Sequence, residues 1–316
     1  MGSSTPVTAF RLGLVGAGRM GQTHLRALAD ADGVAIVAVA EPVDSLREKV
    51  ENEFAVKGFS SLDDLLDAGE IDGALIVTPS DTHVEVIAKV AAADLPILCE
   101  KPCGVSPEDT RRAQHIVADA RVPLQIAYWR RFVPELQMLR ERIARRDFGE
   151  ILSVSCLQWD GAPPAASFRT RSGGIFVDMG VHEFDQARWL TSSDFTQLSA
   201  VASSVVTDPE SGGDPDSAQV LCATSSGATV LVSLGRWYAG GDMASVEIFG
   251  TYDHVASVFL DPLEGEAVQL DALRHQASSF ADFVRGGPCL GATVEDAIAA
   301  LGAAANAAAQ LSTQQG

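Results

Sequence analysis

The feature that most constrains the fold is a short apolar run that leads directly into a glycine-rich turn. Phe10 to Val15 is mostly apolar, and Gly16-Ala17-Gly18-Arg19-Met20-Gly21 follows it. From Arg19 to Asp30 the apolar side chains recur at helical spacing. A strand, a G-x-G-x-x-G turn and a helix in this order favour a dinucleotide site, because the glycines let the backbone approach a pyrophosphate at the helix N-terminus. A glycine-rich turn without a ligand is the alternative.

The same alternation of strand and helix continues through the first third of the chain. Short apolar runs predict further strands at Val34–Ala40, Ala74–Val77, Ile97–Cys99 and Leu124–Ala127. Helical patterns lie between them at Ser45–Phe54, Ser61–Ala68, Asp81–Ala93 and Pro107–Ala120, with Ser61 as an expected N-cap. Strands that are apolar at every position and separated by helices are typical of a parallel sheet covered on both faces. We therefore expect a doubly wound Rossmann domain over residues 1–128.

The second half of the chain has a different pattern. Helices are expected at 134–145 and within 173–190, and strands at 151–159, 198–206, 218–224, 229–234 and 245–249. The turn residues Ser225-Ser226-Gly227 separate two of these strands, which indicates antiparallel pairing. Two alanine-rich helical stretches, 277–284 and 294–311, end the chain. Residues 129–316 are therefore expected to form an α+β domain, and the last helices could pack on either domain.

Charge and cysteine usage exclude several classes of partner. The chain carries 23 Lys and Arg residues against 42 Asp and Glu residues, a formal net charge of -19. Such an acidic surface repels phosphate backbones, so neither nucleic acid nor an anionic membrane is expected as a partner. The apolar runs are too short to span a bilayer, and the first residues lack the pattern of a signal peptide. Five scattered cysteines indicate reduced thiols in a cytoplasmic protein.

Residues at strand ends indicate which cofactor binds. Glu41 ends the second strand, 20 positions after Gly21. A carboxylate there accepts hydrogen bonds from the ribose hydroxyls of NAD and repels the 2′-phosphate of NADP, so we expect NAD. Thr78-Pro79-Ser80 and Glu100-Lys101-Pro102 follow later strands, at the edge of the sheet where ligands bind. Thr78 and Ser80 could equally be simple helix caps.

Candidate catalytic groups come from both halves of the chain. Asp178, His182 and Asp185 have the spacing i, i+4, i+7, which places them on one face of a helix. A histidine between two carboxylates suits a general base, although a buried structural histidine or a metal ligand would give the same spacing. No further ligands with clear metal spacing accompany them, so no metal is expected. Lys101 at its strand end could stabilise a developing alkoxide, or it could be a surface lysine.

Taken together, these motifs resemble one enzyme family. The glycine turn, Cys99-Glu100-Lys101-Pro102 and Gly173-Gly174…Asp178…His182…Asp185 are similar to the glucose–fructose oxidoreductase / inositol dehydrogenase / MocA family, and within it most to inositol 2-dehydrogenases. The resemblance covers nearly the whole chain. It implies a C-terminal domain with a large, open, mostly antiparallel sheet. It also implies a homodimer or homotetramer in which such sheets pack face to face.

The resemblance also implies a reaction and a set of site residues. NAD would oxidise a secondary hydroxyl of a cyclic polyol or sugar, with Lys101, Asp178 and His182 as the catalytic trio and a cis peptide bond at Lys101-Pro102. The residues expected to contact the cofactor are Gly16, Ala17, Gly18, Arg19, Met20, Gly21, Glu41, Thr78, Pro79, Ser80, His83, Glu100, Lys101 and Arg130. Those expected to contact the substrate are Lys101, Arg131, Trp159, Asp178, His182 and Asp185.

Some residues depart from the inositol dehydrogenase pattern. The segment 159–164 matches it only in part, and no tyrosine lies near Leu273. Arg169 and Arg171 would suit an acidic or phosphorylated substrate, or they are surface charges. Two alternatives therefore stay open: a reductase acting on a keto-sugar or acidic sugar, and a non-catalytic NAD-binding sensor.

Overall fold

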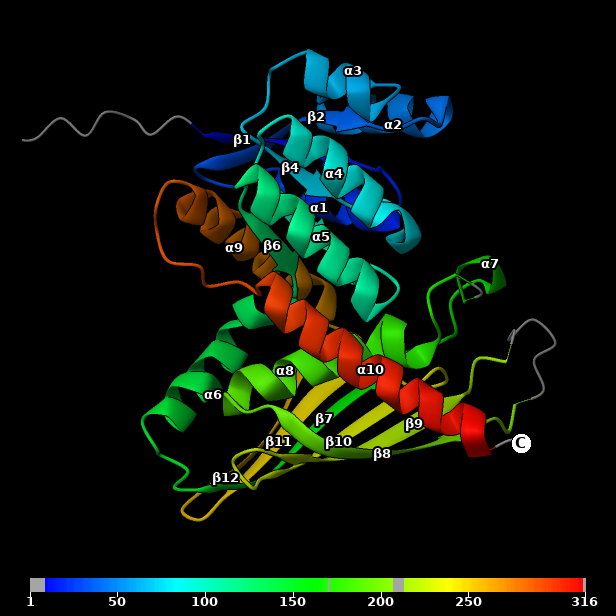
Figure 1. Cartoon of the computed structure of the whole chain (residues 1–316), viewed down its shortest axis with the longest axis vertical. Helices are drawn as coiled ribbons and strands as arrows, with labels where there is room; N and C mark the ends of the chain where they lie inside the picture. Colours follow the sequence, from blue (N-terminus) through cyan, green and yellow to red (C-terminus); the bar gives the residue numbers. More distant parts are fainter. Residues whose placement is uncertain (1–8, 170, 207–212, 315–316) are drawn as a thin grey trace, which may run out of the picture. The chain divides into compact units, whose positions relative to one another are not determined.

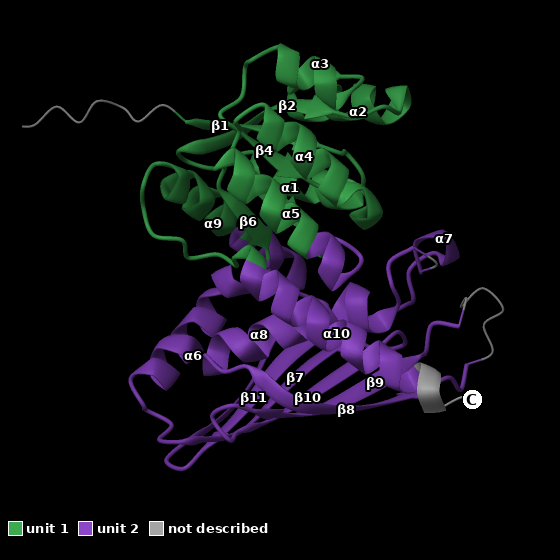
Figure 2. Ribbon diagram, in the orientation of Figure 1, with its two compact units in different colours: residues 1–103, 111–127, 273–294 green, residues 104–110, 128–272, 295–316 purple. Residues whose placement is uncertain are grey.

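The chain folds into two compact units, each built around one six-stranded sheet (Figure 2). The computed structural model describes residues 9–169, 171–206 and 213–314. Unit 1 comprises Met1–Cys103, Arg111–Ala127 and Leu273–Val294. Unit 2 comprises Gly104–Thr110, Tyr128–Ala272 and Glu295–Gly316.

The sheet of unit 1 is wholly parallel, with the strand order β3-β2-β1-β4-β5-β6. Its strands are β1 (Phe10–Val15), β2 (Val34–Ala40), β3 (Lys57–Phe59), β4 (Gly73–Ile76), β5 (Ile97–Glu100) and β6 (Leu124–Ala127). The order reverses between β1 and β4, which is the topological switch point of a doubly wound fold. The predicted Rossmann domain is thus confirmed, while β3 has only three residues and was not predicted.

The helices of unit 1 follow the predicted positions closely. They are α1 (Arg19–Leu28), α2 (Asp44–Phe54), α3 (Leu62–Asp67), α4 (His83–Ala92), preceded by the short η1 (Ser80–Thr82), and most of α5 (Pro107–Ala120). Ser61 caps α3 as expected, since its hydroxyl accepts a hydrogen bond from the Asp64 amide at 3.1 Å. The end of α9 (Gly265–Val284) also belongs here, and Phe280 packs edge-on against Phe10 of β1.

The sheet of unit 2 is mixed, with the order β12-β11-β7-β10-β9-β8. Its strands are β7 (Ile151–Trp159), β8 (Phe195–Ser203), β9 (Ser217–Thr224), β10 (Thr229–Gly235), β11 (Met243–Gly250) and β12 (His254–Leu260). Only β7 and β10 pair in parallel, and β9 and β10 form the predicted antiparallel hairpin. Gly227 in its turn has a φ of 91°, a conformation that glycine adopts without strain.

The helices of unit 2 lie along one face of this sheet, as α6, α8 and α10 show in Figure 1. The elements are η2 (Trp129–Phe132), α6 (Pro134–Ala144), α7 (Ala166–Arg169), η3 (Phe176–Gly180), α8 (Val181–Thr191) and α10 (Val294–Gln314). Side chains of β7 alternate accordingly: Val154 and Cys156 are fully buried, whereas Ser153 and Ser155 are partly exposed. The mostly antiparallel sheet that the family resemblance implied is confirmed.

In the described part of the chain, no helix is both long enough and apolar enough to cross a bilayer. All five cysteines are unpaired, and only Cys289 is exposed.

Candidate active site

The turn between β1 and α1 has the geometry that a pyrophosphate needs. Gly16 has a φ of 100°, and a Cβ there would lie 2.9 Å from the Val77 carbonyl oxygen. A Cβ on Gly21 would overlap the Gly16 carbonyl oxygen, whereas a Cβ on Gly18 would meet nothing within 4 Å. Two glycines are therefore required by packing, and the third leaves open space at the N-terminus of α1. This fits a dinucleotide whose phosphates approach that helix end.

Glu41 lies over the same turn. Its side chain is buried and accepts hydrogen bonds from the amides of Ala17, at 2.9 Å, and Val43, at 3.0 Å. Arg47, the nearest arginine in the sequence, donates to the Glu41 carbonyl oxygen and to Asp44. The carboxylate thus stands at the end of β2 as predicted, and the Arg47 guanidinium is held by these two oxygens.

His83 connects the segments that follow β4 and β5. Its Nδ1 lies 2.8 Å from the Pro102 carbonyl oxygen, and its Nε2 lies 2.8 Å from the Thr78 carbonyl oxygen. The ring is almost fully buried, and burial lowers its pKa. A neutral ring can donate to only one of the two carbonyls. His83 therefore holds together the segments that follow the two strands.

The expected cis peptide bond at Lys101-Pro102 is confirmed.

Glu100 is occupied by protein groups. It is buried, its Oε1 lies 2.8 Å from His24 Nε2, and its Oε2 accepts a hydrogen bond from the Lys101 amide at 3.1 Å. His24 of α1 was not predicted as part of the site, because a lone histidine on a helix carries no signal in the sequence. Glu100 thus holds the Lys101 backbone, and its expected cofactor contact stays a prediction.

Asp178 and His182 belong to two different kinds of helix. Gly173 and Gly174, with φ of 83° and 81°, precede the π-helical turn η3 that contains Asp178, and His182 lies in the first turn of α8. The expectation of one regular helix is therefore corrected, since a π turn rotates Asp178 away from ideal i, i+4 spacing. The His182 ring packs edge-on against the rings of Tyr128 and Trp129, at 6.0 and 6.3 Å.

Asp178 is held by an arginine that the sequence did not reveal. Arg236, directly after β10, is fully buried, and its Nη1 donates to Asp178 Oδ2 at 2.7 Å. Its Nε donates to Asp214 Oδ2 at 3.0 Å, and Asp160 Oδ2 lies 3.8 Å from Nη1. These four residues come from four separate segments, so no sequence spacing connects them.

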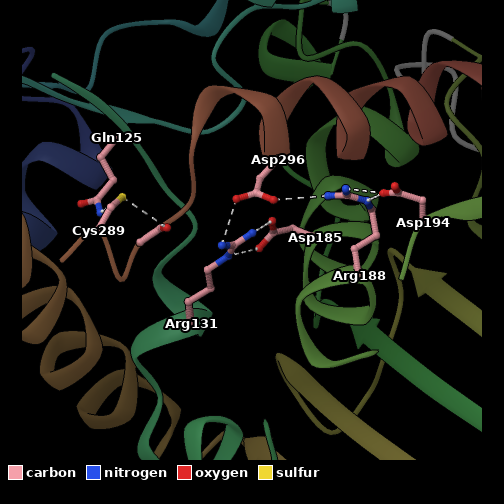
Figure 3. Close-up of polar contacts among 8 residues, drawn as sticks. Gln125, Arg131, Asp185, Arg188, Asp194, Cys289 and Asp296 are labelled. Atoms are coloured by element: carbon pink, nitrogen blue, oxygen red, sulfur yellow. Dashed lines mark hydrogen bonds and ion pairs between the residues drawn. The ribbon is translucent and has the colours of Figure 1, made fainter. Parts of the chain in front are cut away.

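Asp185 and Arg131 are engaged with each other rather than placed as free ligands. Figure 3 shows Arg131 facing both Asp185 of α8 and Asp296 of α10. Its Nε donates to Asp185 at 2.9 Å, and its Nη1 lies 3.1 Å from Asp296. Arg188 continues the chain of charges, 3.5 Å from Asp296 and hydrogen-bonded to Asp194. This network ties α10 to α8, and the substrate contacts expected of Asp185 and Arg131 stay predictions.

Arg130 is likewise occupied inside unit 2. It is buried, pairs with Glu183, and donates to Gln158 at 2.7 Å and Gln186 at 3.3 Å. Burial raises the pKa of Glu183, and Arg130 opposes this effect. Arg130 is thus held within unit 2, and its expected cofactor contact stays a prediction.

Trp159, Arg169 and Arg171 differ in their contacts and exposure. The Trp159 indole donates to the Ser233 hydroxyl at 3.2 Å and packs where Gly235 has no side chain. Ser233 points away from the helix-covered face, because its neighbour Leu234 approaches Gly180 of η3. Trp159 therefore lies on the face of the sheet opposite η3, and its expected substrate contact stays a prediction. Arg169 is buried, not a surface charge, whereas Arg171 is exposed.

Comparisons with known proteins place the chain in a family. Residues 10–128 match the family described as "Oxidoreductase family, NAD-binding Rossmann fold", and residues 136–255 match "GFO/IDH/MocA C-terminal domain". The chain is 50% identical over 295 residues to the rhizopine catabolism protein MocA of Rhizobium meliloti, covering 93% of each chain. The chain belongs to the GFO/IDH/MocA family of oxidoreductases.

Two further comparisons extend this finding. Inositol 2-dehydrogenase of Rhizobium meliloti (strain 1021) is 33% identical over 249 residues, 78% of this chain and 75% of that protein. The fold matches that of scyllo-inositol dehydrogenase from Lactobacillus casei, crystallised with NAD(H) and scyllo-inositol, with a TM-score of 0.84 and 22% identity over 96% of this chain and 97% of that one. The chain is thus an oxidoreductase with an NAD-binding Rossmann domain. The expected family and cofactor are confirmed.

Proposed function

We propose that this protein is an NAD-dependent dehydrogenase that oxidises a secondary hydroxyl of a cyclic polyol or sugar, as inositol 2-dehydrogenases do. The observation that carries the proposal is the pairing of a complete dinucleotide turn with Asp178 and His182 on consecutive helical turns. The relatives named as inositol dehydrogenases support the substrate class. In this proposal residues 1–128 bind NAD, and residues 129–316 hold the substrate.

Three side chains have distinct roles in the proposed reaction. His182 takes the proton of the reacting hydroxyl as general base. Asp178 orients His182 and favours its protonated form once the proton has moved. Lys101 stabilises negative charge on the substrate oxygen. NAD, when bound, supplies the hydride acceptor. The proposal requires Lys101 and His182 to act on the same oxygen.

A substrate panel tests the proposal. The purified protein is incubated with NAD and with myo-inositol, scyllo-inositol, rhizopine, hexoses, pentoses or sugar acids, and NADH formation is followed. Rhizopine is included because of the name of the relative that shares half of the aligned residues. We expect the highest kcat/KM for a cyclic polyol. Turnover of sugar acids alone, or of keto-sugars with NADH, would instead favour the reductase to which exposed Arg171 would contribute. Bound NAD without any turnover would favour a sensor.

We further propose that the protein is a cytoplasmic homo-oligomer. The face of the unit 2 sheet opposite its helices carries exposed apolar side chains on three strands, namely Val201, Leu221 and Val258. Such a patch is typical of a subunit interface. The five unpaired cysteines are consistent with a reducing compartment.

A further inference from the structure

Three carboxylates converge on one buried guanidinium in unit 2. Arg236 contacts Asp178 and Asp214 directly, and Asp160 lies 3.8 Å away. The Arg236 side chain is only 1% exposed, and that of Asp214 is 4% exposed. If all four groups are ionised, the cluster has two negative charges in excess. Burial raises the pKa of both Asp160 and Asp214, so the arrangement is not one that stability alone favours.

The hydrogen bonds of the cluster fix the position of Asp178. Asp214 accepts from Arg236 through Oδ2 and from the Ile175 amide, at 2.7 Å, through Oδ1. Ile175 immediately precedes the π-helical turn that carries Asp178. Arg236 is fixed from its own backbone as well, because its amide donates to the Asp216 carbonyl oxygen at 2.7 Å. One planar guanidinium, held on two sides, therefore sets where Asp178 Oδ2 lies.

We propose that Arg236 is a positioning residue for the reaction: anchored by Asp214, it holds the Asp178 carboxylate in the orientation that His182 requires. This rests on the proposed function, in which Asp178 orients His182. Arg236 touches neither substrate nor cofactor in this role and acts only through Asp178. Lysine keeps the positive charge but cannot bridge Asp178 and Asp214 with a rigid fork, so charge alone does not replace it.

The test is a double-mutant cycle with Asp178. In the otherwise unchanged enzyme, R236K is expected to lower kcat at least about tenfold, with the KM for NAD within about twofold of the starting value. In the D178N background, the same R236K change is expected to alter kcat less than about twofold, because the group it positions is gone. A purely structural arginine would cause equal losses in both backgrounds, and that result, or an unchanged kcat for R236K, overturns the proposal.

Two further variants keep the test decisive. D214N removes the anchor of Arg236 and is expected to repeat the pattern, so it replaces R236K if the lysine variant does not fold. If neither variant folds, as judged by circular dichroism and NAD binding, Arg236 serves stability and the proposal fails. D253N is the matched control: Asp253 is an exposed carboxylate that accepts from the His254 amide without contacting Arg236, and kcat is expected to stay unchanged. A normal kcat for D178N alone would contradict the proposed function itself, independently of position 236.

Discussion

At the scale of single residues, two glycines of the β1–α1 turn are needed for different physical reasons. Gly21 is glycine because any Cβ would collide with the Gly16 carbonyl oxygen, while Gly18 is glycine although its surroundings are empty. We therefore expect Gly21 to be needed for folding and Gly18 to be needed for binding of the dinucleotide. The two can therefore be separated by substitution.

Gly18→Ala is expected to leave Tm unchanged and to weaken NAD binding at least about tenfold, equivalent to about 1.4 kcal/mol, because the methyl group fills the space that the pyrophosphate needs. Gly21→Ala is expected to destabilise the fold itself, by about 2 kcal/mol or more. Gly302→Ala, in the interior of α10 with nothing within 4 Å of an added Cβ, is the control and should preserve NAD affinity. Equal NAD affinity for Gly18→Ala and wild type, by calorimetric titration, would contradict this account.

His83 is expected to make stability depend on pH. Burial lowers the pKa of its ring in the folded protein, whereas an unfolded histidine titrates near 6.5. Below that pH the unfolded chain binds more protons than the folded one, so stability should fall as the pH drops from 7 towards 5. The contribution is fully present above the unfolded pKa and is lost as pH falls towards the lower folded pKa.

Thermal unfolding at pH 7 and pH 5 measures this effect. His83→Gln is expected to show a smaller loss of Tm between the two pH values than wild type, and exposed His115→Gln should behave like wild type. Glu100 and Asp81 lie near His83 and are unchanged in both variants. An undiminished pH dependence in His83→Gln would show that the ring does not titrate this way.

At the scale of elements, the C-terminal helix is joined to the helix that carries His182. Asp296 in the first turn of α10 pairs with Arg131 and Arg188, and Asp185 of α8 pairs with the same Arg131 (Figure 3). Arg131 is 6% exposed and Asp296 is 27% exposed. Removal of the Asp296 carboxylate would leave the buried Arg131 guanidinium with one counter-charge fewer, and water could not fully replace it.

Asp296→Asn is therefore expected to lower the free energy of unfolding by about 1–3 kcal/mol. Asp253→Asn is the matched control, because Asp253 pairs with Arg142 through an exposed ion pair, where a smaller loss is expected. Thermal unfolding compares the two. A loss for Asp296→Asn no larger than that of the control would mean that this network does not hold α10.

Some elements of the fold could be predicted from the sequence, and others could not. Periodicity located the β1–α1 turn, the strand Val34–Ala40 and the cap at Ser61, because each depends on neighbours within a few residues. It missed β12, and it missed the π turn at Asp178 because a helical pattern does not distinguish a π turn from a regular one. Arg236 and His24 were missed for a different reason. Their partners lie 58 and 76 positions away in the sequence, and only the fold brings them together.

At the scale of the whole molecule, the sheet of unit 2 has one face covered by helices and one face that carries exposed leucine and valine. Leu221 is 58% exposed in the isolated chain. Exposed apolar side chains on one face of a sheet are typical of a surface that a partner covers. The proposed homo-oligomer would cover it.

Leu221→Lys is accordingly expected to shift the protein from oligomer to monomer in size-exclusion chromatography with light scattering. Leu263→Lys, which changes a residue that is 94% exposed outside the strands, should leave the oligomer intact. A wild-type protein that is already monomeric at micromolar concentration would refute the proposed assembly.

We propose that Lys101 and His182, from different parts of the chain, serve one reaction with NAD. The most direct measurement is kcat for Lys101→Ala and His182→Ala on the best polyol of the panel, together with the Kd for NAD. We predict that each variant loses about 100-fold or more in kcat while NAD binding stays within about threefold. The exposed residues Lys89 and His115, each changed to alanine, serve as controls and should keep normal turnover. Near-normal kcat in Lys101→Ala and His182→Ala would contradict the account.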